Sequence, residues 1–280
     1  MTNQELRQLQ LTACDVRKCV LTATHSAKSG HPGGSLSAAD LFTYLYFHEL
    51  RIDPKQPKME SRDRFVLSKG HTAPGLYSAL AYRDFFPVSD LPTLRHADSY
   101  LQGHPNMNLV PGVDMSTGSL GQGVSCAAGM AKGAKYLNED VNVYTLLGDG
   151  EIEEGQVWEA FMFAAHFKLD NLCVIIDING LQIDGPTEKV MNSAPVDAKM
   201  EAFGFNVVTI DGHDFDQIES AFAAFRACTG KPTAILMHTT KGKGVSYMEN
   251  SVDWHGKAPN DAEYEVAMGE LRAAMAELEA

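Results

Sequence analysis

The sequence predicts an α/β fold in which a doubly wound parallel sheet is flanked by helices. Two observations support this prediction. Apolar runs of strand length alternate with helical patterns in the second half of the chain, as they do in right-handed βαβ units. In addition, a length of 280 residues with 44% hydrophobic side chains suits one large α/β domain that folds without disulfides. We therefore expect residues 1–280 to form a single domain.

The first elements in chain order are two predicted helices. Residues 2–5 have capping-box spacing, and apolar residues then recur at helical intervals. Gly30 is expected to end this helix, and residues 31–34, His-Pro-Gly-Gly, are expected to form a turn. Ser37 is then expected to cap a second helix over residues 38–50.

The strand signals lie in the second half of the chain. Apolar runs with strand character cover residues 141–147, 172–178, 206–210 and 233–238. Helical patterns cover residues 156–167, 216–228 and 261–280, and the last of these helices is expected to cap the domain. Residues 51–114 are rich in Pro, His and polar side chains and support no assignment. Buried apolar strands joined by helices predict a parallel sheet that is covered on both faces.

Charge and cysteine usage exclude several classes of protein. The 23 Lys and Arg residues against 36 Asp and Glu residues give a net charge of −13, which argues against binding to nucleic acid or acidic membranes. The five cysteines are scattered without a CxxC pair, so neither a zinc cluster nor a disulfide framework is indicated. No signal peptide or membrane span is evident. We expect a cytoplasmic protein.

Polar residues follow two of the predicted strands. Asp149 and Asn179 are separated by roughly thirty residues, the length of one βαβ crossover, so both should lie at the carboxyl edge of the sheet. Their oxygen atoms suit Mg²⁺ or Ca²⁺, and the shortage of further ligands suggests that phosphate oxygens complete the coordination. Gly150 would let its N–H approach such a phosphate. The alternative is an ordinary pair of strand-end turns.

The joint spacing of these motifs resembles a known family. Gly148-Asp-Gly150 followed by Asn179 looks like the diphosphate and Mg²⁺ motif of thiamine diphosphate (ThDP) enzymes. Transketolase is the closer resemblance, and the segments that carry it, in family order, are residues 29–33, 68–71, 103–105, 117–123 and 254–256. The resemblance covers the N-terminal, diphosphate-binding part of a transketolase. It implies that the pyrimidine-binding and C-terminal domains reside on a partner chain, as in a split transketolase.

The resemblance also implies roles for individual residues. The metal ligands would be Asp149, Asn179 and the carbonyl of Leu181, with Mg²⁺ as the ion and Ca²⁺ or Mn²⁺ as substitutes. The contacts to ThDP would come from His71, Gly118, Leu120, Gly150, Asn179, Ile183 and His255. The catalytic groups would be His31, His104, His255 and Glu154, the last as part of an acidic network between subunits.

Several of these residues have a simpler interpretation. Histidines beside Gly or Pro are often exposed turn residues. Glu154 and Glu159 could be first-turn acids that interact with a helix dipole, and Glu159 could lie on a solvated face. Residues 241–244, Lys-Gly-Lys-Gly, are predicted to be a solvated surface loop rather than a lid that contacts phosphate.

The function expected from the resemblance is that of a transketolase of the pentose phosphate pathway type. With its partner, in an α₂β₂ assembly, the chain would transfer a two-carbon ketol unit from a ketose phosphate to an aldose. Histidine side chains would move the protons, whereas the glutamate that activates the aminopyrimidine would come from the partner. Two alternatives remain open. One is a related ThDP enzyme, either a specialised sugar transketolase or an enzyme like deoxyxylulose-phosphate synthase, and the other is a non-catalytic regulatory subunit.

Overall fold

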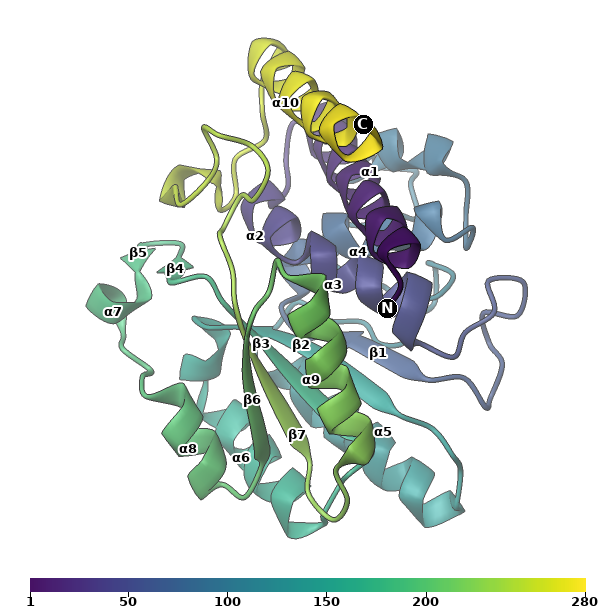
Figure 1. Cartoon of the computed structure of the whole chain (residues 1–280), viewed down its shortest axis with the longest axis vertical. Coiled ribbons are helices and arrows are strands. Elements are labelled where there is room, and N and C mark those ends of the chain that lie inside the picture. Colours follow the sequence, from purple (N-terminus) through teal and green to yellow (C-terminus); the bar gives the residue numbers. More distant parts are fainter.

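A five-stranded parallel sheet forms the centre of the computed structural model, which describes residues 1–280 (Figure 1). In spatial order the strands are β1 (Arg64–Leu67), β2 (Val143–Gly148), β3 (Leu172–Ile178), β7 (Thr233–His238) and β6 (Asn206–Asp211). Every neighbouring pair in this sheet is parallel. The predicted fold class is therefore confirmed.

The order of the strands makes the sheet doubly wound. The chain runs from β1 through β2 to β3, passes to the edge strand β6 and then returns inward to β7. The helices α5 (Gln122–Leu137), α6 (Gly155–His166) and α8 (Val196–Ala202) cover one face, whereas α9 (Phe215–Ala227) covers the other (Figure 1). The connection from β6 to β7 runs across the sheet in the opposite direction to the earlier connections. A right-handed crossover in that direction places its helix, α9, on the opposite face.

The central strand β3 shows how the two cores are separated. Its side chains alternate between the faces, so Leu172, Val174 and Ile176 pack into the core beneath α5 and α6, while Cys173 and Ile175 pack into the opposite core. All five are completely buried. A strand that is covered on both faces appears in the sequence as a continuous apolar run, which is why it could be predicted.

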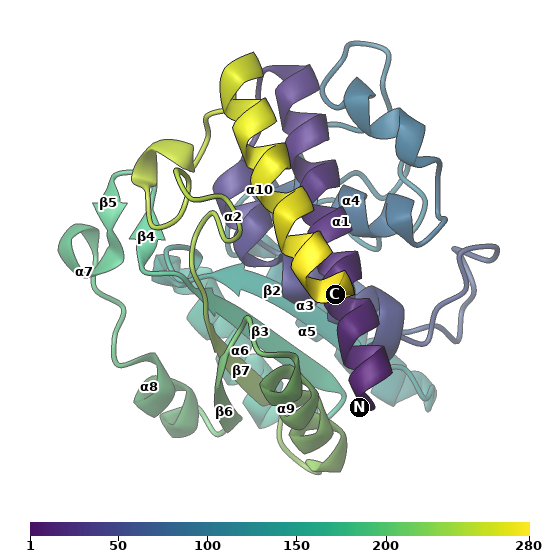
Figure 2. The same ribbon diagram turned by 45° about the horizontal axis from the view of Figure 1, so that its top comes forward.

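A layer of helices from the first part of the chain covers the second face together with α9. It comprises α1 (Asn3–Ala27), α3 (Ala39–Tyr44) and α4 (Ala73–Tyr82), and α10 (Asp261–Glu279) packs on α1 outside this core. The helix α10 lies alongside α1 in both views (Figures 1 and 2), and thus caps the domain as predicted. The predicted capping box is also present, because the Thr2 N–H donates to the Glu5 carboxylate at 2.7 Å and the Glu5 N–H donates to Oγ1 of Thr2 at 3.2 Å.

The region after α1 differs from the prediction. The helix ends at Ala27, with Lys28 in the left-handed conformation, and not at Gly30. The His-Pro-Gly-Gly segment is not a turn, because Pro32 starts the short helix α2 (Pro32–Ser37), where a proline at the first position is favoured. Ser37 does not cap a helix. Its Oγ donates instead to the buried Asp177 carboxylate at 2.8 Å, a tertiary contact that overrides the local capping preference.

The remaining elements are short. The predicted helix over residues 38–50 is divided into α3 and a π-helical segment, Leu45–Glu49. Turns of 3₁₀ helix cover Gly70–Thr72, Val88–Thr93, Glu151–Glu153 and Val252–Trp254. A small hairpin of β4 (Leu181–Gln182) and β5 (Gly185–Pro186) precedes α7 (Thr187–Val190). None of the helices combines the length and apolar character that crossing a lipid bilayer would require.

Candidate functional site

The carboxyl ends of β2 and β3 lie side by side, as their spacing predicts. Gly148 is opposite Asp177 in the parallel register, and the Asp149 N–H donates to the Asp177 carbonyl at 3.1 Å. The Asp149 carboxylate then accepts from the N–H of Gly180 at 2.6 Å and from the N–H of Gly150 at 3.0 Å. The two loops that follow the strands are thereby joined.

A pocket of about 320 Å³ lies over these strand ends. All but two of the predicted site residues line it, namely His31, His71, Gly118, Leu120, Asp149, Gly150, Asn179, Leu181, Ile183 and His255. A larger hollow of about 700 Å³ lies elsewhere, between the C-terminal half of α5 and residues 107–114, and contains none of the predicted residues. The motifs that are far apart in the sequence thus converge on one pocket.

His104 and Glu154 are the two predicted residues that do not line the pocket. His104 is exposed and packs beside the pocket residue Gly118, where an added Cβ would lie 3.0 Å from Cγ of the imidazole. Glu154 is exposed at the start of α6 and packs against Gly121. Glu159 is also exposed and lines a separate small hollow between α5 and α6. The two glutamates therefore face outward.

The oxygen atoms at the strand ends suit a hard cation. Asp149 is 4% exposed, and burial together with the nearby Asp177 raises the pKa of its carboxyl to about 6. The Asn179 amide nitrogen donates to Asp177 at 3.2 Å and its Oδ1 accepts the Leu181 N–H at 3.1 Å. This Oδ1 and the Leu181 carbonyl are neutral oxygens of the kind that hard cations bind. The structure has no cluster of three or more His, Cys, Asp or Glu side chains that could hold a metal alone. The donor set fits Mg²⁺ or Ca²⁺ when a ligand such as a diphosphate supplies further oxygens.

Three imidazoles form one wall of the pocket. The ring centroids of His31, His71 and His255 lie 5.2 to 5.5 Å apart. Burial lowers the pKa of all three imidazoles, and nearby cationic groups and the neighbouring imidazoles add to the effect. The pKa falls to about 4 for His31 and to about 3 for His255, and that of His71 lies well below its usual value. All three are therefore neutral near pH 7. The buried Nδ1 of His31 has no hydrogen-bond partner and is available to a ligand.

The prediction that residues 241–244 form a solvated surface loop is wrong for Lys241. Its side chain is 2% exposed and reaches into the pocket, where Nζ lies 3.1 Å from the Leu181 carbonyl and 2.8 Å from Nδ1 of His255. Burial lowers the pKa of the ammonium group to about 8. The loop turns inward because Gly242 adopts a positive φ and its N–H donates to the Gly33 carbonyl at 3.0 Å. The sequence signal was its position directly after a strand, at the edge where the other site loops begin.

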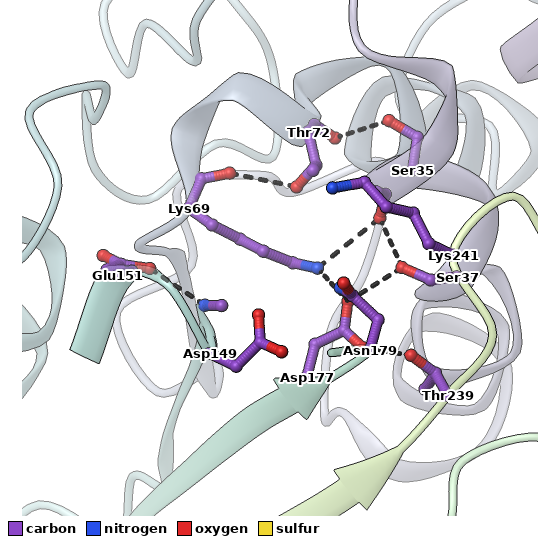
Figure 3. A network of polar contacts seen from close by, with 12 residues as sticks. Ser35, Ser37, Lys69, Thr72, Asp149, Glu151, Asp177, Asn179, Thr239 and Lys241 are labelled. Atoms are coloured by element: carbon purple, nitrogen blue, oxygen red, sulfur yellow. Dashed lines mark hydrogen bonds and ion pairs between the residues drawn. The ribbon is translucent and has the colours of Figure 1, made fainter. Parts of the chain in front are cut away.

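A second cation, Lys69, was not predicted. It is 2% exposed and forms an ion pair with the fully buried Asp177, which also accepts from Ser37 and Thr239 (Figure 3). Although burial opposes ionisation of Asp177, Lys69 and these hydroxyls hold the pKa of its carboxyl below the usual value. The charge of Lys69 is thus balanced within the protein. Lys241 has neutral hydrogen-bond partners and forms no ion pair, although the Asp149 carboxylate lies near enough to favour its charged form.

Glu151 also went unpredicted and connects three loops around the pocket. Its buried carboxylate accepts from the N–H of Gly121 at 3.0 Å, from the N–H of Gly148 at 3.1 Å and from the Ser68 hydroxyl. These partners lie at the start of α5, at the end of β2 and just after β1. In the sequence, Glu151 is one of several acids in a row, and only the tertiary contacts distinguish it from its neighbours.

The chain shares its sequence with transketolases. It matches the family described as "Transketolase, thiamine diphosphate binding domain" over residues 9–274. It is 42% identical over 271 residues to the 6-deoxy-6-sulfo-D-fructose transketolase subunit of Clostridium sp. (strain MSTE9), covering 97% of this chain and 98% of that protein. It is 41% identical over 275 residues to an apulose-4-phosphate transketolase subunit of Phocaeicola vulgatus, with 98% of each covered.

The fold is shared with a transketolase of greater length. The crystal structure of transketolase from Campylobacter jejuni superposes with a TM-score of 0.90 at 33% identity, covering 99% of this chain and 46% of that one. The chain thus spans less than half of that transketolase but nearly the full length of the two subunits. On this agreement of sequence and structure, the chain belongs to the transketolase family and comprises its thiamine diphosphate-binding domain.

Proposed function

We propose that this chain is the ThDP-binding subunit of a two-subunit transketolase that transfers a ketol unit between sugars. The main support is the pocket at the strand ends, which combines an all-oxygen donor set, the Lys241 ammonium group outside any ion pair, and three neutral imidazoles. These are the groups needed to hold a metal-bound diphosphate and to move protons beside it. An intact set of this kind disfavours the alternative of a non-catalytic regulatory subunit.

The proposed cofactor site follows from the chemistry of the lining residues. Asp149, Asn179 and the Leu181 carbonyl would hold Mg²⁺, for which Ca²⁺ or Mn²⁺ could substitute, and the diphosphate would supply further oxygens. Gly150 would approach the diphosphate through its N–H, which is possible because it has no side chain. Lys241 would exchange its hydrogen bond to the Leu181 carbonyl, which the metal needs, for the diphosphate and neutralise part of that charge.

The other cofactor contacts are assigned to parts of ThDP. His71 would contact the diphosphate, while Gly118 and Leu120 would lie against the aminopyrimidine ring. Ile183 would pack near the thiazolium, and its 64% exposure leaves an apolar surface for that ring to cover. When bound, ThDP supplies the electron sink for breaking and forming the carbon–carbon bond beside a ketose carbonyl.

Proton movement is assigned to the histidines. His31 and His255 line the pocket as neutral imidazoles, and His104 lies at its edge beside Gly118. A neutral imidazole can accept a proton from a sugar hydroxyl and return it to the product. A bound diphosphate would bring negative charge close to these rings and raise their pKa values toward neutrality.

The proposed partner subunit supplies the groups that this chain lacks. The pocket contains no free glutamate that could activate the aminopyrimidine, since the carboxylate of Glu151 is occupied by three donors. Exposed apolar side chains on α6, including Met162 and Phe163, offer a surface for subunit contact on the helix that Glu154 precedes. We assign Glu154 to an acidic network across that interface. We propose an α₂β₂ assembly. The five free cysteines favour a reducing, cytoplasmic location.

The names of two relatives bear on the choice of substrate. The two subunit-length relatives described above are named for specialised sugars, 6-deoxy-6-sulfo-D-fructose and apulose-4-phosphate. This observation favours a specialised sugar transketolase as a second candidate beside an enzyme of the pentose phosphate pathway. An assay of the assembled enzyme with a panel of ketose donors, with and without phosphate or sulfonate groups, would distinguish the two.

The metal and cofactor assignment can be tested by calorimetry. We expect ThDP to bind the assembled enzyme only when Mg²⁺ is present. Asp149→Ala should abolish this binding because it removes the one charged metal ligand, whereas the exposed Asp197→Ala serves as a matched control and should leave binding unchanged. Unaltered ThDP affinity in Asp149→Ala would overturn the proposed function.

A further inference from the structure

A buried ionic cluster outside the pocket joins three separate parts of the chain. Arg17 of α1 donates from Nη1 and Nη2 to the two oxygens of Asp40 of α3, at 2.9 and 2.6 Å. Nδ1 of His213, in the loop between β6 and α9, lies 2.7 Å from the same carboxylate. Arg17 and Asp40 are only 6% and 5% exposed. None of the three residues lines the pocket.

The outer atoms of this cluster hold the loop that carries Lys241. Nε2 of His213 accepts the Thr240 N–H at 2.9 Å, and Nε of Arg17 donates to the Lys243 carbonyl at 3.2 Å. The two contacts therefore lie on either side of Lys241 in the sequence. They fix the backbone one residue before and two residues after Lys241, whose side chain enters the pocket.

The hydrogen bonds determine the tautomer of His213. Because Nε2 accepts a backbone N–H, it carries no proton, and the proton on Nδ1 must donate to Asp40. Asp40 is kept ionised by the adjacent Arg17, which outweighs the cost of burial and holds the pKa of the carboxyl at about 2. The carboxylate thus orients the imidazole, and the imidazole in turn orients the loop.

Stability alone gives little reason for such an arrangement. Buried ion pairs often contribute no more stability than apolar side chains of the same size. Apolar side chains, however, could not accept the Thr240 N–H or donate to the Lys243 carbonyl. Lys241 is moreover the pocket cation that forms no ion pair, its hydrogen-bond partners being neutral, so the position of its backbone determines where positive charge is available to a ligand.

We propose that Arg17, Asp40 and His213 act as positioning residues that hold the 240–243 loop so that the Lys241 ammonium group remains in the pocket. This inference rests on the proposed function, in which Lys241 interacts with the diphosphate of ThDP. His213 then affects the cofactor only through Lys241.

A double-mutant cycle tests this dependence. The measurement is ThDP affinity, by calorimetry in the presence of Mg²⁺, of the chain purified with its partner subunit. We expect Lys241→Met to weaken affinity on the order of 30-fold and His213→Ala on the order of tenfold, magnitudes typical of a lost charge-assisted contact and of a lost positioning contact. In the Lys241→Met background, His213→Ala should have no further effect. Multiplicative losses would overturn the proposal, because His213 would then act independently of Lys241.

A matched control and a conservative variant complete the test. His25→Ala also removes a histidine–carboxylate contact, with Asp261 at 2.8 Å, but this contact joins α1 to α10 and does not touch the loop. It should leave ThDP affinity unchanged. His213→Gln retains an acceptor for the Thr240 N–H and should recover part of the affinity. A His213→Gln variant as weak as His213→Ala would contradict the role of this hydrogen bond.

Hydrogen exchange separates failure of this inference from failure of the proposed function. In the ligand-free protein, His213→Ala should accelerate amide exchange of the peptide over residues 239–246, whereas His25→Ala should not. Unchanged exchange there would overturn the positioning role whatever ThDP does. If the unmodified enzyme fails to bind ThDP while the exchange result holds, the proposed function is wrong but the cluster still controls the loop.

Discussion

Acidification should destabilise the ligand-free chain through the histidines of the pocket. His31 and His255 have pKa values of about 4 and 3 in the folded state, against 6.5 for an unperturbed histidine. The unfolded chain therefore binds protons more readily than the folded one. Above about pH 6.5 the histidines are neutral in both states and do not lower the free energy of unfolding. As the pH falls from there toward the pKa values of the folded state, protonation of the unfolded chain lowers the free energy of unfolding progressively.

The size of this effect follows from the same values. One pKa unit corresponds to about 1.4 kcal/mol, so at about pH 5 each histidine should lower the free energy of unfolding by up to about 2 kcal/mol relative to neutral pH. Both side chains are only partly buried, which makes this figure an upper value. Asp149 acts in the opposite direction because its raised pKa favours the folded state as the pH falls through about 6. Variants are therefore needed to isolate the histidines.

Urea unfolding at several pH values provides the assay. The loss of stability between about pH 7.5 and 5 should be smaller in His31→Asn and His255→Asn than in the unmodified chain, by up to about 2 kcal/mol each. The exposed His166→Asn is the matched control and should not alter the pH dependence. Identical pH dependence in the pocket variants and in this control would refute the inference that the pocket imidazoles are held neutral.

Three further predictions follow from the geometry of the site. Glu151→Ala should lower the free energy of unfolding by about 3 kcal/mol, because two buried N–H groups lose their acceptor; a change below about 1 kcal/mol in urea unfolding would contradict this. His104→Ala should lower kcat or raise KM for the donor ketose, with a loss in kcat/KM on the order of 10²-fold, while ThDP affinity changes little; unaltered steady-state kinetics would identify His104 as a surface residue. Gly242→Ala should destabilise the chain by about 1–3 kcal/mol, because its φ of +80° is strained for any residue with a Cβ; unchanged thermal unfolding would show that the loop can rearrange.

Sequence patterns predicted the central sheet because its strands are buried on both faces. The bounds of β3 and β7 agree with the predicted runs, and β2 begins two residues later than expected. The edge strand β1 was not identified, since four residues within a region rich in Pro and polar side chains carry no periodic signal. The predicted helix boundaries near α2 and α3 were wrong for another reason. There the local preferences of Gly30 and Ser37 are outweighed by tertiary packing and by the contact with Asp177.

The pocket could be predicted where its residues directly follow strands or lie within family motifs. Asp149 and Asn179 were found because the carboxyl ends of neighbouring parallel strands meet at one edge. Lys69 and Asp177 could not be paired in advance, since they are 108 positions apart and both are buried. His213 is separated from Asp40 by 173 positions. Such contacts depend on how the helices pack on the sheet, which periodicity and composition do not specify.

Reconstitution of activity tests the central claim most directly. The purified chain, supplied with ThDP and Mg²⁺, should not transfer ketol units between sugars, because the activating glutamate is expected on the partner. Addition of the purified partner subunit should produce both an assembly with the mass of α₂β₂, measured by light scattering, and turnover of a ketose donor. Robust turnover by this chain alone, or absence of turnover and of ThDP binding in the assembled mixture, would contradict the account.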